Sequence, residues 1–309
     1  MSGMQGFPGR VGLAGFLVLL AVLAVGCGAQ QEKPSAMPVD DDLDRINRAA
    51  RLAFENRRPE QAADLYRRAL ERALVRADAN QVADVRYNLA VCLMELGDTR
   101  RALERVTQAK SELVRAGLPI PADFHLLEAT ILYRDNRPVK SSGSLDAILS
   151  SSKDPAPVIL SKTYFLQGLI AAENGNVVRL KEAIANMGIA SDDDLRADRA
   201  ELIGRLAILE QRWRQAVSAL DNAVGLRRRG LDYRRMAIAL ALSAEACERD
   251  GRGKEAAGRY LQAGRSAAVA GEVSDAGRWL QRAAELSEQY DDPEIAREAG
   301  DLLDRLAEE

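Results

Sequence analysis

Small and apolar residues recur along this chain in a fixed order, with a period of nearly 40 residues. The clearest copy of the pattern reads Leu89, Ala90, Leu93, Gly97, Asp98, Ala102, Val106 and Ala109. Two antiparallel helices pack closely only where small side chains occupy their crossing points. Gly97 stands between the two periodic segments, where a helix end needs a residue that tolerates positive φ. The pattern therefore predicts a hairpin of two helices.

The small residue that opens the second helix of each hairpin serves as an anchor for following the pattern. The anchors are Ala62, Ala102, Ser141, Leu180, Ala216 and Ala256, which are 40, 39, 39, 36 and 40 residues apart. A hairpin cannot bury its apolar side alone, so neighbouring hairpins must stack. We therefore expect an all-α, right-handed solenoid of about six to seven hairpins rather than an irregular alanine-rich bundle. Single helices near 254–270 and 273–289 and a capping helix from Pro293 to Ala307 are expected to complete it.

In these residues the chain resembles the tetratricopeptide repeat family. Repeats of that family have small residues at their eighth, twentieth and twenty-seventh positions, with a glycine-marked turn, and a usual period of about 34. The spacing here is similar to that of its longer-helix variety, and the resemblance covers about Leu43 to Ser287. It implies a binding scaffold without catalytic residues, in which the first helix of each hairpin lines a concave groove.

The family register, transferred onto this sequence, predicts which side chains line that groove. The predicted partner-binding residues are Asn47, Arg51, Phe54, Tyr87, Val91, Met94, Leu126, Tyr133, Phe165, Leu169, Glu201 and Arg205. The register also includes Asp44, Asp84, Asp123, Lys162 and Asp198. An apolar middle with a polar rim suits an extended or helical peptide. The same side chains could instead only pack against neighbouring helices, and the sequence leaves both interpretations open.

The family's clamp for C-terminal carboxylates uses Lys and Asn on adjacent first helices. Asn47 and Arg51, then Tyr87 and Val91, stand at these places here. We therefore do not expect a receptor for carboxylate tails.

The N-terminus has the features of an export signal. Val11 to Val25 is an uncharged apolar run of the length of a signal-peptide core. The four residues from Ala24 to Cys27 resemble a bacterial lipobox, which implies removal of residues 1–26 and a lipid on Cys27. Residues 27–42 are polar and predict a flexible tether before a solenoid at 43–309. The alternative is an uncleaved anchor helix, for which 19 apolar residues barely span about 30 Å of hydrocarbon.

Because Gly28 rather than aspartate follows the cysteine, the resemblance implies the outer membrane, facing the periplasm. Lipobox and repeats together resemble the assembly lipoproteins and pilotins of Gram-negative outer membranes. The expected function is a membrane-tethered periplasmic scaffold that binds envelope proteins and supports assembly of an envelope complex. The alternative is a regulator of cell-wall synthases or hydrolases.

Composition argues against several other functions. A net charge of −3 and a pI near 5.6 argue against nucleic-acid binding. His125 is the only histidine, so no metal site of several histidines is expected. The sequence contains no glycine-rich phosphate loop, and neither a cofactor nor a small-molecule substrate is expected. Cys92 and Cys247 are interpreted as small buried apolar residues. Arg227–Arg229 with Arg234 and Arg235 is interpreted as a basic helix end, with a lipid phosphate or an acidic partner as the alternative.

Overall fold

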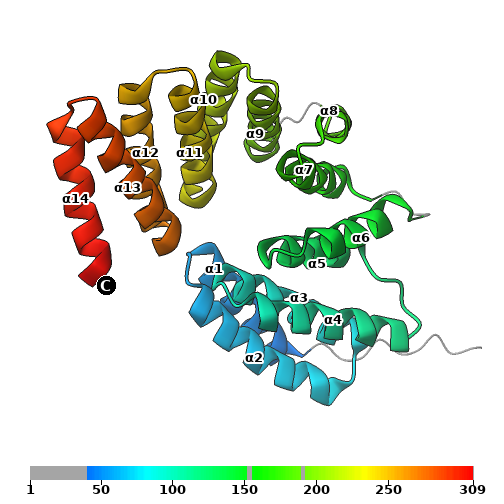
Figure 1. Cartoon of the computed structure of the whole chain (residues 1–309). Coiled ribbons are helices and arrows are strands. Elements are labelled where there is room, and N and C mark those ends of the chain that lie inside the picture. The colour runs from blue at the N-terminus through cyan, green and yellow to red at the C-terminus, as the bar shows by residue number, and fades with distance from the viewer. Residues whose placement is uncertain (1–39, 152–154, 189–191, 309) are drawn as a thin grey trace, which may run out of the picture. The chain divides into compact units, whose positions relative to one another are not determined.

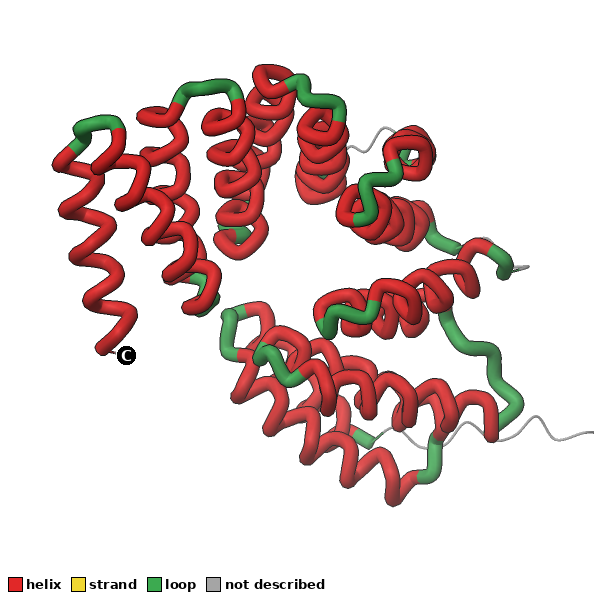
Figure 2. Tube along the Cα trace, viewed as in Figure 1, coloured by secondary structure: helices red, strands yellow, loops and turns green. Residues whose placement is uncertain are grey.

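The computed structural model describes residues 40–151, 155–188 and 192–308, and the chain from Asp41 onward forms one compact unit. All regular structure in these residues is helical (Figures 1 and 2). The helices are α1 (Asp41–Glu55), α2 (Pro59–Arg76), α3 (Ala79–Glu95), α4 (Thr99–Arg115), α5 (Ala122–Arg134), α6 (Pro138–Leu149), α7 (Pro157–Glu173), α8 (Val177–Asn186), α9 (Asp193–Leu209), α10 (Trp213–Arg229), α11 (Tyr233–Arg249), α12 (Gly253–Val269), α13 (Val273–Gln289) and α14 (Pro293–Glu308).

Each helix packs mainly against the helices next to it in the chain (Figure 1). The described residues therefore form seven consecutive hairpins, and the predicted all-α solenoid is confirmed. The last two helices, expected as a single helix and a cap, pair as a seventh hairpin. Helices α13 and α14 pack against each other, and the turn between them has a positive φ at Asp291, as the preceding hairpin has at Gly251.

The predicted signal peptide and Cys27 lie outside the described residues. The solenoid begins at Asp41, two residues before the expected start, so the predicted tether cannot extend to residue 42. Asp41, Asp42 and Asp44 occupy the first turn of α1, where carboxylates interact favourably with the helix dipole. None of the described helices is both long enough and apolar enough to cross a membrane.

All six anchor residues are fully buried, with exposed fractions of 0 %. Where the anchor is polar, as at Ser141, its hydroxyl donates to the carbonyl of Ala129 on the partner helix at 2.8 Å. Close approach also requires Gly204, because a Cβ there would lie 2.5 Å from Cγ of Leu220. The small-residue pattern therefore marks the places where paired helices touch.

The turn within each hairpin is built in the same way throughout. One residue has positive φ at each turn: Arg57, Gly97, Asn136, Gly175, Gln211, Gly251 and Asp291. At the second turn, the N–H of Gly97 donates to the carbonyl of Met94 at 3.1 Å, and the N–H of Asp98 donates to that of Leu93 at 2.9 Å. These two bonds satisfy carbonyls that would otherwise have no partner at the end of α3.

Ala216 tests the predicted crossing points. We expect Ala216→Leu to lower the free energy of unfolding by about 1–3 kcal/mol, because extra volume at a filled crossing displaces the partner helix. The measurement is a denaturant titration followed by circular dichroism. Ser218→Leu, on the exposed side of the same helix, is the matched control. Equal midpoints for the two variants would contradict the assigned crossing.

Candidate functional site

A central hollow of about 480 Å³ lies against the first helices of hairpins two to seven. Seven of the twelve predicted groove residues line it: Met94, Leu126, Tyr133, Phe165, Leu169, Glu201 and Arg205. Leu166 and Ile238 add to its apolar surface. The helical residues of the described lining belong to the first helices α3, α5, α7, α9, α11 and α13, with Thr99 at the start of α4. The register transferred from the sequence covers the first four of these helices.

The other five predicted residues lie elsewhere. Asn47, Arg51 and Tyr87 line a separate hollow of about 390 Å³ formed by the N-terminal hairpins. Phe54 lines a third hollow, and Val91 is partly buried against the N-terminal core. The expected continuous strip is therefore divided into distinct hollows, and binding of a partner at any of them remains a prediction.

The exposed fractions show which side chains at the central hollow pack against neighbouring helices and which have surface that a ligand could contact. Met94, Phe165 and Leu169 each have an exposed fraction of 8 %, so these side chains pack in the core and present only an edge to the hollow. Leu126 and Tyr133 are partly exposed. A ligand in the central hollow would therefore gain most new contact area from these two side chains.

One wall of the central hollow is ionic, and its charges are already paired. Glu201 has an exposed fraction of 4 % and accepts hydrogen bonds from Arg205 Nε at 3.0 Å and Nη2 at 2.8 Å. The Tyr133 hydroxyl donates to the carboxylate of Glu173. Burial, and then this carboxylate, raise the pKa of Tyr133. These groups are held in place before any ligand arrives.

Asp198 forms the centre of a buried ionic cluster beside that wall. Its carboxylate is fully buried and accepts from Lys162 Nζ at 2.7 Å, from Arg235 Nη1 at 3.2 Å and from Arg227. Arg227 has an exposed fraction of 2 % and also pairs with Asp194. The cluster joins α7, α9, α10 and α11. Asp198, which the family register placed on the groove surface, is instead wholly enclosed.

Most arginines of the basic run, Arg227–Arg229 with Arg234 and Arg235, are paired with carboxylates of the solenoid. Arg229 Nη2 lies 2.8 Å from a carboxylate oxygen of Asp193, and Arg234 pairs with Glu95 and Glu272. With Arg227 and Arg235 in the cluster, four of the five arginines form ion pairs within the solenoid. The run therefore offers little free charge to a lipid phosphate, and three of its arginines occupy the last turn of α10 as predicted.

Two polar contacts link the first hairpins to the sixth. Arg57 Nη2 donates to the carbonyl of Leu231 at 2.7 Å, across 174 residues of sequence. The Glu95 carboxylate lies 3.2 Å from Arg134 Nη1 and 3.4 Å from Arg234 Nη1. The third hollow, of about 520 Å³, lies beside these contacts.

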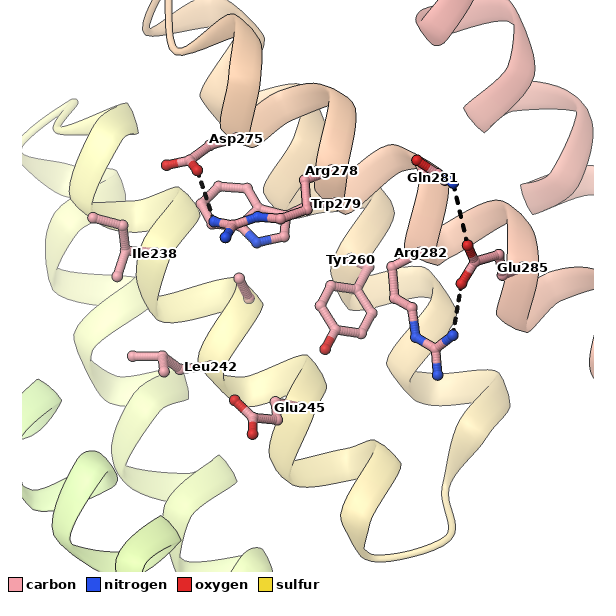
Figure 3. Close-up of a pocket in the computed structure, with 11 residues that line it drawn as sticks. Ile238, Leu242, Glu245, Tyr260, Asp275, Arg278, Trp279, Gln281, Arg282 and Glu285 are labelled. Carbon is pink, nitrogen blue, oxygen red and sulfur yellow. Dashed lines mark hydrogen bonds and ion pairs between the residues drawn. The ribbon is translucent and has the colours of Figure 1, made fainter. Parts of the chain in front are cut away.

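A further hollow, of about 580 Å³, lies among α11, α12 and α13 (Figure 3). Its lining includes Ile238 and Glu245, which occupy the register positions of Asp84 and Val91, 154 residues further on. The Arg278 guanidinium carbon lies 5.6 Å from the ring centroid of Trp279, close enough for a cation–π interaction. The prediction missed this hollow because it did not extend the register beyond the fifth repeat.

The two thiols of the solenoid are buried in its core. Cys92 and Cys247 are free and buried, and burial raises their pKa values to about 12 and about 11. Both thiols are therefore protonated near neutral pH, as expected of small core residues. Among the described residues, no group of three His, Cys, Asp or Glu side chains could hold a metal ion.

Asp198 provides a test of the ionic cluster. We expect Asp198→Asn to lower the free energy of unfolding by about 3–5 kcal/mol, because it leaves the buried Arg227 without its full countercharge. The matched control is Asp193→Asn, which breaks exposed ion pairs of the same helix and should leave the midpoint nearly unchanged. A titration with guanidinium chloride gives both values, and equal midpoints would show that the cluster is not required.

Comparison with known proteins supports the architecture. Neither a protein-family model nor a curated protein matches the sequence. The apo form of the quorum sensor NprR from B. thuringiensis is 12 % identical, with a TM-score of 0.55 over 88 % of this chain and 89 % of that one. PilW, a type IV pilus biogenesis factor, is 18 % identical, with a TM-score of 0.51 over 72 % of this chain and 93 % of PilW.

A tetratricopeptide repeat protein from Parabacteroides merdae is 11 % identical, with a TM-score of 0.50 over 84 % of this chain and 99 % of that one. At these identities the likeness concerns the fold alone. The chain therefore has the fold of a tetratricopeptide-type solenoid.

Proposed function

We propose that this chain is a lipid-anchored, periplasm-facing scaffold that holds a peptide segment of an envelope protein against the first helices of its solenoid. The observation that carries the proposal is the central hollow, with its apolar floor and its ionic wall. An extended or amphipathic segment gains affinity by placing apolar side chains in such a hollow, while fixed polar groups at its edge set the orientation.

Preorganisation favours this role. The side chains of the ionic wall are paired with one another, so binding does not require them to be ordered first. Ordering of side chains is one of the main costs of association. Partly exposed Leu126, Tyr133 and Ile238 then supply the contact surface.

The membrane anchor is the second part of the proposal, and its support is the lipobox-like segment ending at Cys27. A single acyl chain holds a protein only marginally, whereas several chains hold it stably. PilW, which shares the fold, is a type IV pilus biogenesis factor. Support of the assembly of an envelope complex is the role that we propose here, at the outer membrane.

Cys27→Ser tests the anchor, because lipid attachment requires the thiol. We expect the variant to lose labelling by radioactive palmitate and to remain uncleaved or leave the membrane fraction. Cys92→Ser, which removes a thiol from the core, should keep the label. Persistent labelling of the serine variant at position 27 would exclude lipidation at this site.

Site-specific crosslinking tests the groove. A photoreactive benzoylphenylalanine in place of Leu126, in intact cells, should crosslink to a short segment of one envelope protein, which mass spectrometry identifies. The matched control places the same residue at Val139, on α6, whose exposed fraction is 85 %. Identical crosslinks from both positions, or none from position 126, would contradict binding in the central hollow.

A further inference from the structure

Two of the loops that join successive hairpins present an apolar surface. Residues 116–122, from the end of α4 to the start of α5, and residues 155–161, where α7 begins, contain no charged side chain. The turns within the neighbouring hairpins differ, because residues 96–101 and residues 135–140 each contain three. Both loops lie on one side of the solenoid and both turns on the other (Figure 1). The two sides of these hairpins are therefore chemically distinct.

The two loops meet around a hollow of about 550 Å³. Ile120 and Val158 belong to its lining, and half-buried Asp123 is the one charged side chain that the described lining contains. Val158 has an exposed fraction of 49 %, and Val114, in the last turn of α4, one of 60 %. We call this surface the apolar edge, and its described residues are Val114, residues 119–122 and residues 155–159. Exposed apolar surface gathered in one place is typical of a contact with a partner or a membrane.

The chain enters the solenoid on the same side as the apolar edge. The carboxylate of Asp42, in the first turn of α1, lies 3.2 Å from Arg72 Nη2, near the end of α2. Because successive helices run in opposite directions, the starts of α1, α5 and α7 share this side (Figure 1). Cys27 precedes Asp41 by 14 residues, which reach at most about 50 Å. A lipid on Cys27 would therefore hold this side of the solenoid next to a bilayer.

The chemistry of the apolar edge favours a bilayer over a protein partner. Pro119, Pro121 and Pro155 line its hollow, and proline has no backbone N–H to donate. The edge therefore offers few polar groups with which to fix the orientation of a protein, whereas specific interfaces carry many hydrogen bonds. Entry into a lipid interface depends mainly on the apolar area that is buried. A tether raises the effective concentration of the second contact, so that a small area suffices.

We infer that the apolar edge lies in the lipid interface, so that the solenoid stands on the membrane through this side. The inference rests on the lipid anchor of the proposed function and adds a second membrane contact to it. The side chains of Val114 and Val158 then enter about 5–10 Å into the boundary between headgroups and acyl chains, and the turns within the hairpins face away from the membrane. A lipid on Cys27 alone would leave the solenoid free to rotate, whereas two contacts give the central hollow a fixed orientation.

The test measures contact between lipid and single labelled positions of the full, lipid-modified chain. Val114→Cys and Val158→Cys place a thiol on the apolar edge, and the matched controls Val139→Cys and Val178→Cys place one at exposed valines of the opposite side. Each introduced thiol carries the fluorophore nitrobenzoxadiazole, and the unchanged protein, whose described thiols are buried, should take no label. The vesicles contain phosphatidylethanolamine, phosphatidylglycerol and a phosphatidylcholine that carries a quenching doxyl group on the fifth acyl carbon.

We expect the quenching lipid to remove most of the fluorescence at positions 114 and 158 and little at positions 139 and 178, because only the apolar edge brings its labels level with the doxyl group. Adding Val158→Asp should restore the fluorescence of the label at position 114, since a carboxylate resists transfer out of water. Adding Val178→Asp, the matched control, should leave that label quenched. All four valines are exposed, so the unfolding midpoint from circular dichroism should not change.

Flotation of the vesicles through a density gradient separates the inference from the proposed function. A chain that floats while the labels at all four positions are quenched equally, or not at all, would overturn the inference and leave the lipid anchor in place. A label at position 114 that is shielded from water but not quenched would mean that protein covers the apolar edge, which also overturns the inference. A chain that does not float with the vesicles would overturn both the anchor and the second contact.

Discussion

Close contact between the two helices of each hairpin is the constraint from which the rest of this solenoid follows. Fully buried anchors such as Ala62, Ala102 and Ala216 leave room for the backbone and side chains of the partner helix. Once the two helices are closely paired, their remaining apolar residues lie on surfaces that only another hairpin can cover. The first helices then lie next to one another, and the hollows remain where their side chains do not contact one another.

The fourth and fifth hairpins show a second way of holding helices together. The anchor of the fourth hairpin is the bulky Leu180, and its second helix, α8, has only 10 residues. There, Lys162 on α7 pairs directly with Asp198 on α9. A buried ion pair contributes less to net stability than its short distance suggests, because both charges lose hydration. Its hydrogen bonds nevertheless join α7, α9, α10 and α11 at one buried carboxylate.

Much of the architecture could be predicted because repeat patterns are local. Small residues mark helix crossings, and glycine or asparagine marks the turns at Gly97, Asn136, Gly175 and Gly251. The turn at Gln211 also has a positive φ without a sequence signal. There, the N–H groups of Gln211 and Arg212 donate to the carbonyls of Ile208 and Ala207, and these hydrogen bonds hold a residue that does not prefer this conformation.

The site was less predictable, because it depends on pairings between distant residues. Arg227 and Arg228 look alike in sequence, yet one is buried against Asp198 and the other is exposed. Seven side chains of the transferred register line the central hollow. The register could not show that Phe165 packs in the core or that Asp198 is enclosed. The position of a residue in the repeat determines which face of the helix it lies on, but not how deeply its side chain is buried.

Two contacts, of Arg57 with Leu231 and of Glu95 with Arg234, affect how the chain unfolds. In a solenoid whose repeats touch only their neighbours, the ends can fray independently and unfolding spreads along the stack. Here, the first and second hairpins also contact the sixth. Opening at the N-terminal end therefore removes two polar contacts from α11 and its preceding loop. We therefore expect opening of the first hairpins to increase amide exchange at the start of α11, although 177 residues separate Glu55 from Tyr233 along the chain.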